Sequence, residues 1–160
     1  MFDPREEIRD ILRAYKPDGQ SEEGMIFHDT HGTEHEMGVY LWEEQVTNFE
    51  EGGKLGLSNP MMILLSLISS VSVNANIGAT RRKPIALIDA HIFVVKDDRW
   101  QAEPVKMEIS NQIEDAIRAS QTSISGCDFV ECINARDLDA LKQTLGVRRI
   151  VGMRAYGNIS

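Results

Sequence analysis

Two runs of alternating residues, joined by one short turn, constrain the fold of this chain most strongly. In residues 65–77, one set of alternate positions is mainly apolar and the other is mainly serine and asparagine. In residues 85–95, one face is wholly apolar and the other carries Asp89 and His91. A period of two is typical of half-buried strands, and the GATRRKP turn at 78–84 predicts a long antiparallel hairpin. The positions of the first run that we expect to face the core are Leu65, Leu67, Val71, Val73, Ala75 and Ile77.

Helical spacing marks the segments that flank this hairpin. An N-terminal helix is expected after Asp3, with Pro4 in its first turn and apolar residues as far as Tyr15. A central helix is expected from Pro104, with an apolar stripe on one side. A short third helix is expected at residues 136–145, and Gly146 would then be its C′ residue.

Shorter strands complete the expected order of elements. They are predicted at the start of 39–49, at 127–133 and at 147–156, from their β-branched and aromatic residues. The predicted fold class is α+β: a mainly antiparallel sheet with a long β-hairpin, flanked by an N-terminal helix, a central helix and a short third helix. At 160 residues we expect a single domain, 1–160, with a core of its own.

Composition narrows the classes of function. A formal net charge of −8 argues against general binding of nucleic acid, which needs a positive surface. The most apolar run, residues 61–68, is far shorter than the roughly 18 residues of a membrane-spanning helix. The N-terminus lacks the features of a signal peptide, so we expect a cytoplasmic protein without a membrane partner. Cys127 and Cys132 are expected to be free thiols, since on one strand they would point to opposite faces.

The stretch HDTHGTEHE, residues 28–36, raises the possibility of a metal site. His28, His31 and His35 could converge on one ion, with Asp29 or Glu36 completing the shell. Their spacing matches no known metal motif, and no cysteine lies nearby. The glycine and threonines favour a polar loop, and we prefer that interpretation, with no metal and no cofactor.

A second candidate for chemistry lies on the hairpin. Asp89 and His91 are two residues apart on one face of the expected strand and could form a catalytic dyad. The sequence contains no nucleophile motif and no glycine-rich phosphate loop. We therefore expect a partly buried or interfacial polar pair and predict that the chain is not an enzyme.

Several basic residues are candidates for contacts between subunits. They occupy the hairpin turn, a charged loop and the last strand, where arginine could pair with an acidic neighbouring copy. A tryptophan beside the loop arginine could anchor such a contact or could simply cover the core. The candidates are Arg81, Arg82, Lys83, Arg99, Trp100, Arg148 and Arg149, and Arg154 adds charge to the last strand.

Three segments of the second half resemble the tail-terminator and tail-completion proteins of tailed viruses. They are IALIDAHIFVVKDDR, PVKMEISNQIEDAIRAS and CDFVECINARDLDALKQTLGVRRIVGMRAY. The resemblance covers residues 61–156 and lies in the order of the elements and in their local sequence patterns. Residues 20–60 depart from it. It carries no catalytic signature. It implies a virion structural protein that forms a ring, usually a hexamer, which caps the tail tube and joins it to the neck.

The implied partners are further copies of the chain, the tail tube and the neck or connector proteins. DNA would pass through an acidic lumen without specific binding. The implied location is the virion tail or neck, with the host cytoplasm during assembly. Two alternatives stay open: a small metal-binding enzyme or regulator built on the histidine cluster, and a dimeric adaptor domain.

Overall fold

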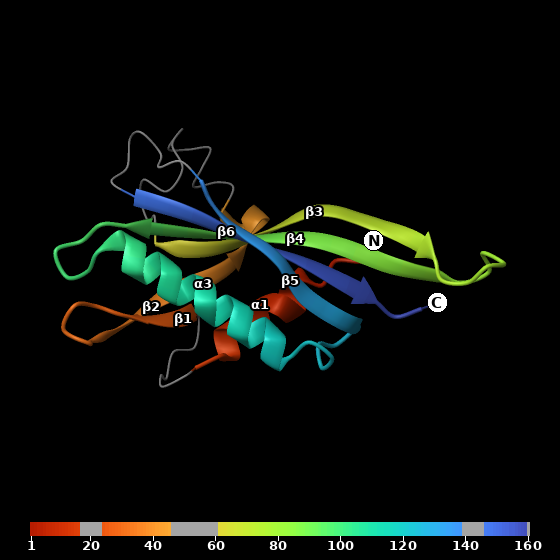
Figure 1. The fold of residues 1–160 in the computed structure, drawn as a ribbon, viewed down its shortest axis with the longest axis horizontal. Helices are drawn as coiled ribbons and strands as arrows, with labels where there is room; N and C mark the ends of the chain where they lie inside the picture. Colours follow the sequence, from red (N-terminus) through yellow and green to blue (C-terminus); the bar gives the residue numbers. More distant parts are fainter. Residues whose placement is uncertain (17–23, 46–60, 139–145, 160) are drawn as a thin grey trace.

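A computed structural model of the chain describes residues 1–16, 24–45, 61–138 and 146–159, and it confirms the α+β class. One six-stranded sheet has the order β1-β2-β3-β4-β6-β5 (Figure 1). Every neighbouring pair is antiparallel except β2 and β3. The strands are β1 (Gly24–His28), β2 (Glu34–Leu41), β3 (Met62–Asn74), β4 (Arg82–Val95), β5 (Cys127–Leu138) and β6 (Gly146–Gly157).

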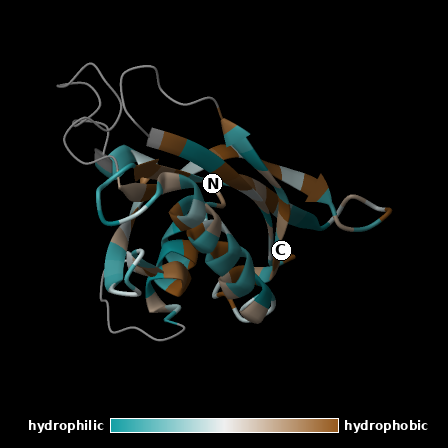
Figure 2. Cartoon of the chain, turned by 60° about the vertical axis from the view of Figure 1, so that its left-hand side comes forward, coloured by the Kyte–Doolittle hydropathy of each residue, from teal (hydrophilic) through white to brown (hydrophobic). Residues whose placement is uncertain are grey.

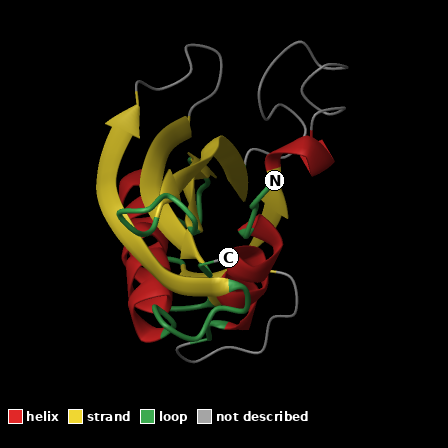
Figure 3. Ribbon diagram, turned by 90° about the vertical axis from the view of Figure 1, so that its right-hand side faces the viewer, coloured by secondary structure: helices red, strands yellow, loops and turns green. Residues whose placement is uncertain are grey.

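Two helices cover one face of this sheet. Helix α1 (Arg5–Ala14) and helix α3 (Ala102–Ala119) lie side by side within the curl of the strands (Figure 3). Their apolar residues, with Ile8 and Ile113 fully buried, pack on the face of β3 and β4 that carries Leu65 and Ile88. The expected N-terminal and central helices are therefore confirmed. No helix in the described ranges is long and apolar enough to cross a membrane.

The prediction of a third helix from residue 136 is wrong at its start. Arg136, Asp137 and Leu138 belong to β5, where they pair with residues 148–150 of β6. Asp137 is held there by ion pairs of 2.9 Å to both Lys106 and Arg149. Residues 139–145 lie outside the described residues, and Gly146 begins β6. Pairing with a long neighbouring strand therefore decides the conformation of residues 136–138, against the helix expected there.

A bulge corrects the predicted facing of the hairpin. The pairing of β3 with β4 shifts between Leu67 and Ser69, so one extra residue, Ile68, lies in β3. Leu65 and Leu67 pack on the core as predicted, but Val71 and Val73 are exposed. A single inserted residue reverses every later side chain in a strand. The prediction that the second half of this strand faces the core is therefore wrong.

The histidine-rich stretch, interpreted as a polar loop, forms the turn of the β1–β2 hairpin and the strand residues on either side of it. His28 ends β1, and β2 begins at Glu34. The Asp29 carboxylate accepts backbone N–H bonds from His31 and Thr33 at 2.8 and 2.9 Å. Gly32 adopts the left-handed φ of 79° that the turn requires. The strand expected from residue 39 thus begins earlier and ends at Leu41, followed by the 3-10 helix η1 (Trp42–Gln45).

Candidate functional site

The far half of the β3–β4 hairpin extends beyond the helices as an arm. We define the arm as residues 68–85. It reaches past both helices in Figure 1 and stands clear of the body in Figure 2. Its turn is ordered by Asn76, whose side-chain oxygen accepts the N–H groups of Thr80 and Arg81 at 3.0 and 3.2 Å. The arm is thus a defined projection from the described body of the protein.

Large apolar side chains of the arm face water. The exposed fractions are 56% for Ile68, 53% for Val71, 39% for Val73 and 107% for Ile77. Scattered exposed apolar residues are ordinary on a protein surface, whereas a cluster of them marks an interaction site. These four follow one another along a single projection, so the arm offers a contact surface.

The apolar surface continues across the sheet on the face that the helices do not cover. Val71 pairs with Ile85, Ile85 with Tyr156, and Tyr156 with Phe129, so one row crosses four strands. The last three side chains are half-buried, and the rings of Phe129 and Tyr156 lie 6.2 Å apart. We call these four residues the outer row.

The basic residues of the turn lie at the tip of this arm. Arg81 is exposed. The Arg82 guanidinium bonds the Asn74 side chain at 2.7 Å and the Ser72 carbonyl at 3.2 Å. Lys83 makes an ion pair of 2.6 Å with Asp128. The sequence therefore identified a charged projection, although Lys83 is already paired within the chain.

Arg99 and Trp100 lie at a different place, beside the turn between β1 and β2. Trp100 is only 8% exposed, packs edge-on against Phe27 and donates its indole N–H to the Val95 carbonyl at 2.9 Å. Arg99 pairs with Asp97 and stacks over the Trp100 ring at 4.7 Å. Trp100 thus covers the core and offers little area to a partner.

Arg148 and Arg149 point to opposite faces of β6. The Arg149 side chain bonds the Ser110 hydroxyl on α3 and the Asp137 carboxylate, both at 2.9 Å. Arg148 lies on the outer face, where its guanidinium stacks over Phe93 at 4.9 Å. Burial lowers the pKa of Arg148, while Asp89 opposes that effect.

His91 on the outer face touches Ser66 rather than Asp89. Its Nε2 lies 2.9 Å from the Ser66 hydroxyl, and its Nδ1 lies 2.7 Å from the Arg148 guanidinium. Asp89 instead pairs with Arg136 at 3.3 Å. Arginine can only donate, so Nδ1 accepts and the neutral ring carries its proton on Nε2.

This tautomer decides what the Ser66–His91 pair can do. With its proton on Nε2, His91 donates to the Ser66 oxygen and cannot remove the hydroxyl proton, as a general base would. Burial, reinforced by Arg148 and Arg136, lowers the pKa of His91 to about 4. The Ser66–His91 contact therefore lacks the arrangement of a nucleophile and its base. The polar pair expected between Asp89 and His91 is not what the structure shows, because Asp89 pairs with Arg136 instead.

The side chains of two histidines in the 28–36 stretch pair with different carboxylates. His28 Nδ1 lies 2.6 Å from the Glu108 carboxylate on α3. His35 Nε2 lies 2.9 Å from Asp29, whose pKa falls to about 2 chiefly through that hydrogen bond. His31 is exposed. Among the described residues, no group of three or more histidine, cysteine or acidic side chains is placed to hold a metal ion.

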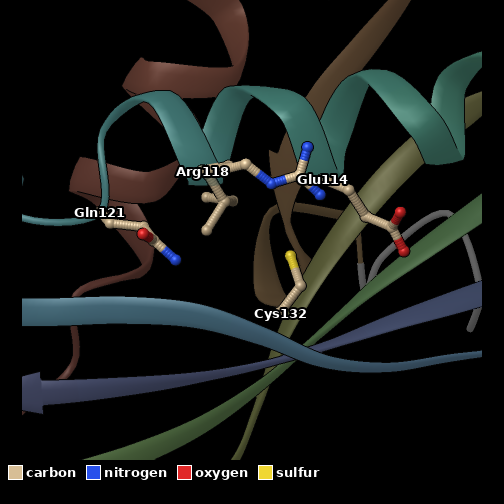
Figure 4. A pocket seen from close by; sticks show the side chains of 5 residues that line it. Glu114, Arg118, Gln121 and Cys132 are labelled. Atoms are coloured by element: carbon tan, nitrogen blue, oxygen red, sulfur yellow. The ribbon is translucent and has the colours of Figure 1, made fainter.

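A pocket of about 220 Å³ lies between the end of α3 and β5 (Figure 4). Its polar lining residues, Glu114, Arg118 and Gln121, stand around the thiol of Cys132. Burial and the nearby Glu114 raise the pKa of that thiol to about 12, so it stays protonated and weakly nucleophilic.

Sequence reasoning missed the outer row and the buried Arg5. The outer row depends on pairing between residues as far apart as Ile85 and Tyr156 (156 − 85 = 71), which no local pattern contains. A signal for the exposed arm did exist, because Ile68 breaks the alternation of the first run at the bulge. Arg5 showed no signal, since arginine in the first turn of a helix is usually solvated.

Comparison with known proteins adds no relative to this description. No protein-family model matches the chain. No curated protein matches its sequence.

Proposed function

We propose that the chain is a virion structural protein of the tail-terminator kind, whose copies form a ring that caps a tail tube and joins it to the neck. The exposed apolar surface of the arm carries this proposal, because such a surface is stabilised by burial against another protein. The kind of assembly, a ring at the end of a tail tube, is inferred from the resemblance of residues 61–156 to that family. The Ser66–His91 geometry supports a structural rather than a catalytic role.

The charge distribution supports contact between copies of the chain. Residues 74–83 carry three basic side chains and no acid, whereas the whole chain has a net charge of −8. The remainder therefore carries −8 − 3 = −11. A basic arm is attracted to the acidic body of a neighbouring copy, and repeated head-to-tail contacts close into a ring. An acidic ring would also repel DNA phosphates and let DNA pass.

Replacing one apolar residue of the arm tests this proposal. We expect Val71→Asp to abolish the ring seen by negative-stain electron microscopy, because a carboxylate would be buried at the contact. The free energy of unfolding of the monomer should change by no more than about 0.5 kcal/mol, since Val71 is exposed.

Met107→Asp is the matched control. Met107 is a 38% exposed apolar residue on α3, away from the arm, and its replacement should leave the ring intact. Rings that survive Val71→Asp, or that disappear equally in both variants, would contradict the proposed role of the arm.

A further inference from the structure

The two end strands of the sheet, β1 and β5, differ in how far their outer edges are closed to pairing with a further strand. On the outer side of β1, the Gly24 carbonyl accepts a hydrogen bond from Lys16 and the Ile26 carbonyl accepts one of 2.6 Å from Gln112. The His28 N–H donates to Glu108 at 3.2 Å. Side chains thus close the β1 edge against a further strand.

The edge of β5 is open along most of its described length. Its Val130 N–H points outward, to the Gln121 carbonyl at 3.0 Å. Backbone groups of a strand face its two sides alternately, and β5 has an irregularity between Cys132 and Asn134. The pairing of β6 with β4 has no shift, so alternate residues of β6 bond to β5 throughout. Val151 and Arg149 have the same orientation as Ala155, the partner of Val130. Their partners on β5, Ala135 and Asp137, therefore turn their backbone groups outward as Val130 does. No other described strand pairs there.

The arm presents a second edge, which is covered by a side chain at the Ser72 carbonyl. The pairing of β2 with β3 ends at Leu65, whose carbonyl accepts a bond from Arg5 at 3.3 Å. Within the described ranges, no strand pairs with β3 on that side beyond Leu65. The Ala75 N–H donates to the Arg81 carbonyl, so alternation turns the backbone groups of Ser72 outward. The Arg82 side chain covers the Ser72 carbonyl.

These two edges bound the same part of the sheet. In the order β3-β4-β6-β5 the arm edge and the β5 edge lie on opposite sides of four strands. A contact between unlike edges repeats from copy to copy and continues the sheet sideways, as a head-to-tail interface requires. A contact between like edges would stop at a dimer.

The charges disfavour a contact between two arms. Arg81 and Arg82 at the tip form no ion pair with a described residue, whereas Lys83 pairs with Asp128 of the same chain. The other acids of β5 also have cations of the same chain beside them, Glu131 near Arg154 and Asp137 with Lys106 and Arg149. Two arms would bring the tip guanidinium groups together, whereas an arm on β5 places them near the acidic side chains of that strand.

We propose that the outer edge of β3, residues 67–74, adds as a strand to the outer edge of β5, residues 130–137, of a second copy of this chain. This rests on the proposed function and names the contact by which the ring would close. Backbone hydrogen bonds supply affinity in such strand addition, and side chains supply specificity. The exposed Ile68 and Ile133 flank the two edges and would lose water on contact.

Two proline variants, each blocking one edge, test the contact. Ser72→Pro removes an outward N–H from the arm, and Ala135→Pro removes one from β5, without removing a donor within the sheet. Each variant alone should lose the ring, because every copy then lacks one edge. A mixture should form a 1:1 heterodimer that grows no further, since only one edge on each partner remains open. Native mass spectrometry of the separate and mixed variants distinguishes these species.

Other outcomes overturn the proposal and are distinct from one another. Homodimers of Ala135→Pro would indicate pairing of two arms, and homodimers of Ser72→Pro pairing of two β5 strands. Rings that persist in both variants would contradict the proposed edge contact but not the proposed ring. If the mixture forms heterodimers but the wild-type chain forms no closed ring, the edge contact is supported and the proposed ring is contradicted.

A cross-linking experiment tests the same contact without requiring that the proline variants fold. If either proline variant lacks cooperative unfolding, Ser72→Cys and Ala135→Cys chains are mixed with a short bismaleimide at neutral pH. The native thiols react slowly there, because burial raises the pKa of Cys127 to about 11 and that of Cys132 to about 12. A cross-linked heterodimer supports the contact, and cross-linking no faster than in a Ser123→Cys control overturns it.

Discussion

Arg5 is a charged residue held almost entirely out of water at the start of α1. It is 7% exposed, and its guanidinium meets Asp3 at 2.8 Å and Glu43 at 2.7 Å. The hydrogen bond to Asp3 raises its pKa, as does Glu43, against the opposing effect of burial. Through Glu43 and the Leu65 carbonyl, Arg5 connects α1 to η1 and to the end of the β2–β3 pairing.

Replacing Arg5 should therefore destabilise the fold. We expect Arg5→Met to lower the free energy of unfolding by about 2 kcal/mol, because it leaves a carbonyl and two carboxylates without their donor. Chemical denaturation measures this change. Arg9→Ala is the control: its partners Asp10 and Glu44 are exposed, so the change should stay below about 1 kcal/mol. Equal effects of the two substitutions would contradict this account of Arg5.

His91 makes stability depend on pH in a predictable direction. Its pKa is lowered from 6.5 to about 4 in the folded chain. Above pH 6.5 the ring is neutral in both states and contributes nothing to the pH dependence. Between pH 6.5 and 4 the unfolded chain takes up a proton that the folded chain excludes, so stability falls as the pH falls.

The expected loss over that window is on the order of 3 kcal/mol. His91→Gln should remove this part of the slope in urea denaturation measured from pH 7 to pH 4. The control is His31→Gln, at an exposed histidine, in which the part of the slope due to His91 should remain. A wild-type slope in the His91 variant would show that His91 titrates normally in the folded chain.

At the scale of elements, α3 supports the sheet by closing the edge of β1. Gln112 is 8% exposed and donates to the Ile26 carbonyl. We expect Gln112→Leu to cost about 1–3 kcal/mol of unfolding free energy, because the carbonyl is left unsatisfied beside an apolar side chain. Hydrogen exchange should also speed up in β1.

Asn111→Ala provides the control on the same helix, since Asn111 is an exposed amide. It should change neither stability nor exchange in β1 appreciably. If the leucine variant were as stable as the wild type, closure of this edge by Gln112 would not contribute to the fold.

Periodicity predicted those elements whose pattern is local. The hairpin and both long helices follow from alternation and from apolar stripes, and the structure confirms them. The facing of Val71 could not be read from alternation, because one bulged residue reverses it. Residues 136–138 belong to a segment with helical spacing, yet their pairing with β6 places them in a strand. Non-local pairing likewise assembles the outer row.

The candidate site was only partly predictable for the same reason. The charge of the tip at Arg81 and Arg82 is visible in sequence and holds in the structure. The opposite directions of Arg148 and Arg149 follow from their adjacency on one strand. The burial of Trp100 depends on its packing against Phe27, more than 70 residues away. Contacts of this kind require the tertiary structure.

At the scale of the whole molecule, the arm and the body differ in the sign of their net charge and in their exposed apolar residues. The arm is basic with exposed apolar residues, and the body carries the negative charge. Such asymmetry suits a subunit that meets its own kind head to tail, in which each copy gives one arm and receives another. We therefore propose first that copies of this chain assemble through the arm, and second that the assembly belongs to a viral tail.

Native mass spectrometry of the wild-type chain tests that claim most directly. The account predicts a closed ring, a hexamer by resemblance, without a stoichiometric metal ion. A monomer or dimer that carries one bound metal ion would contradict it and favour the histidine cluster as the functional site. A metal-free dimer would favour the adaptor alternative, and a monomer at every concentration would show that the arm does not join copies of this chain.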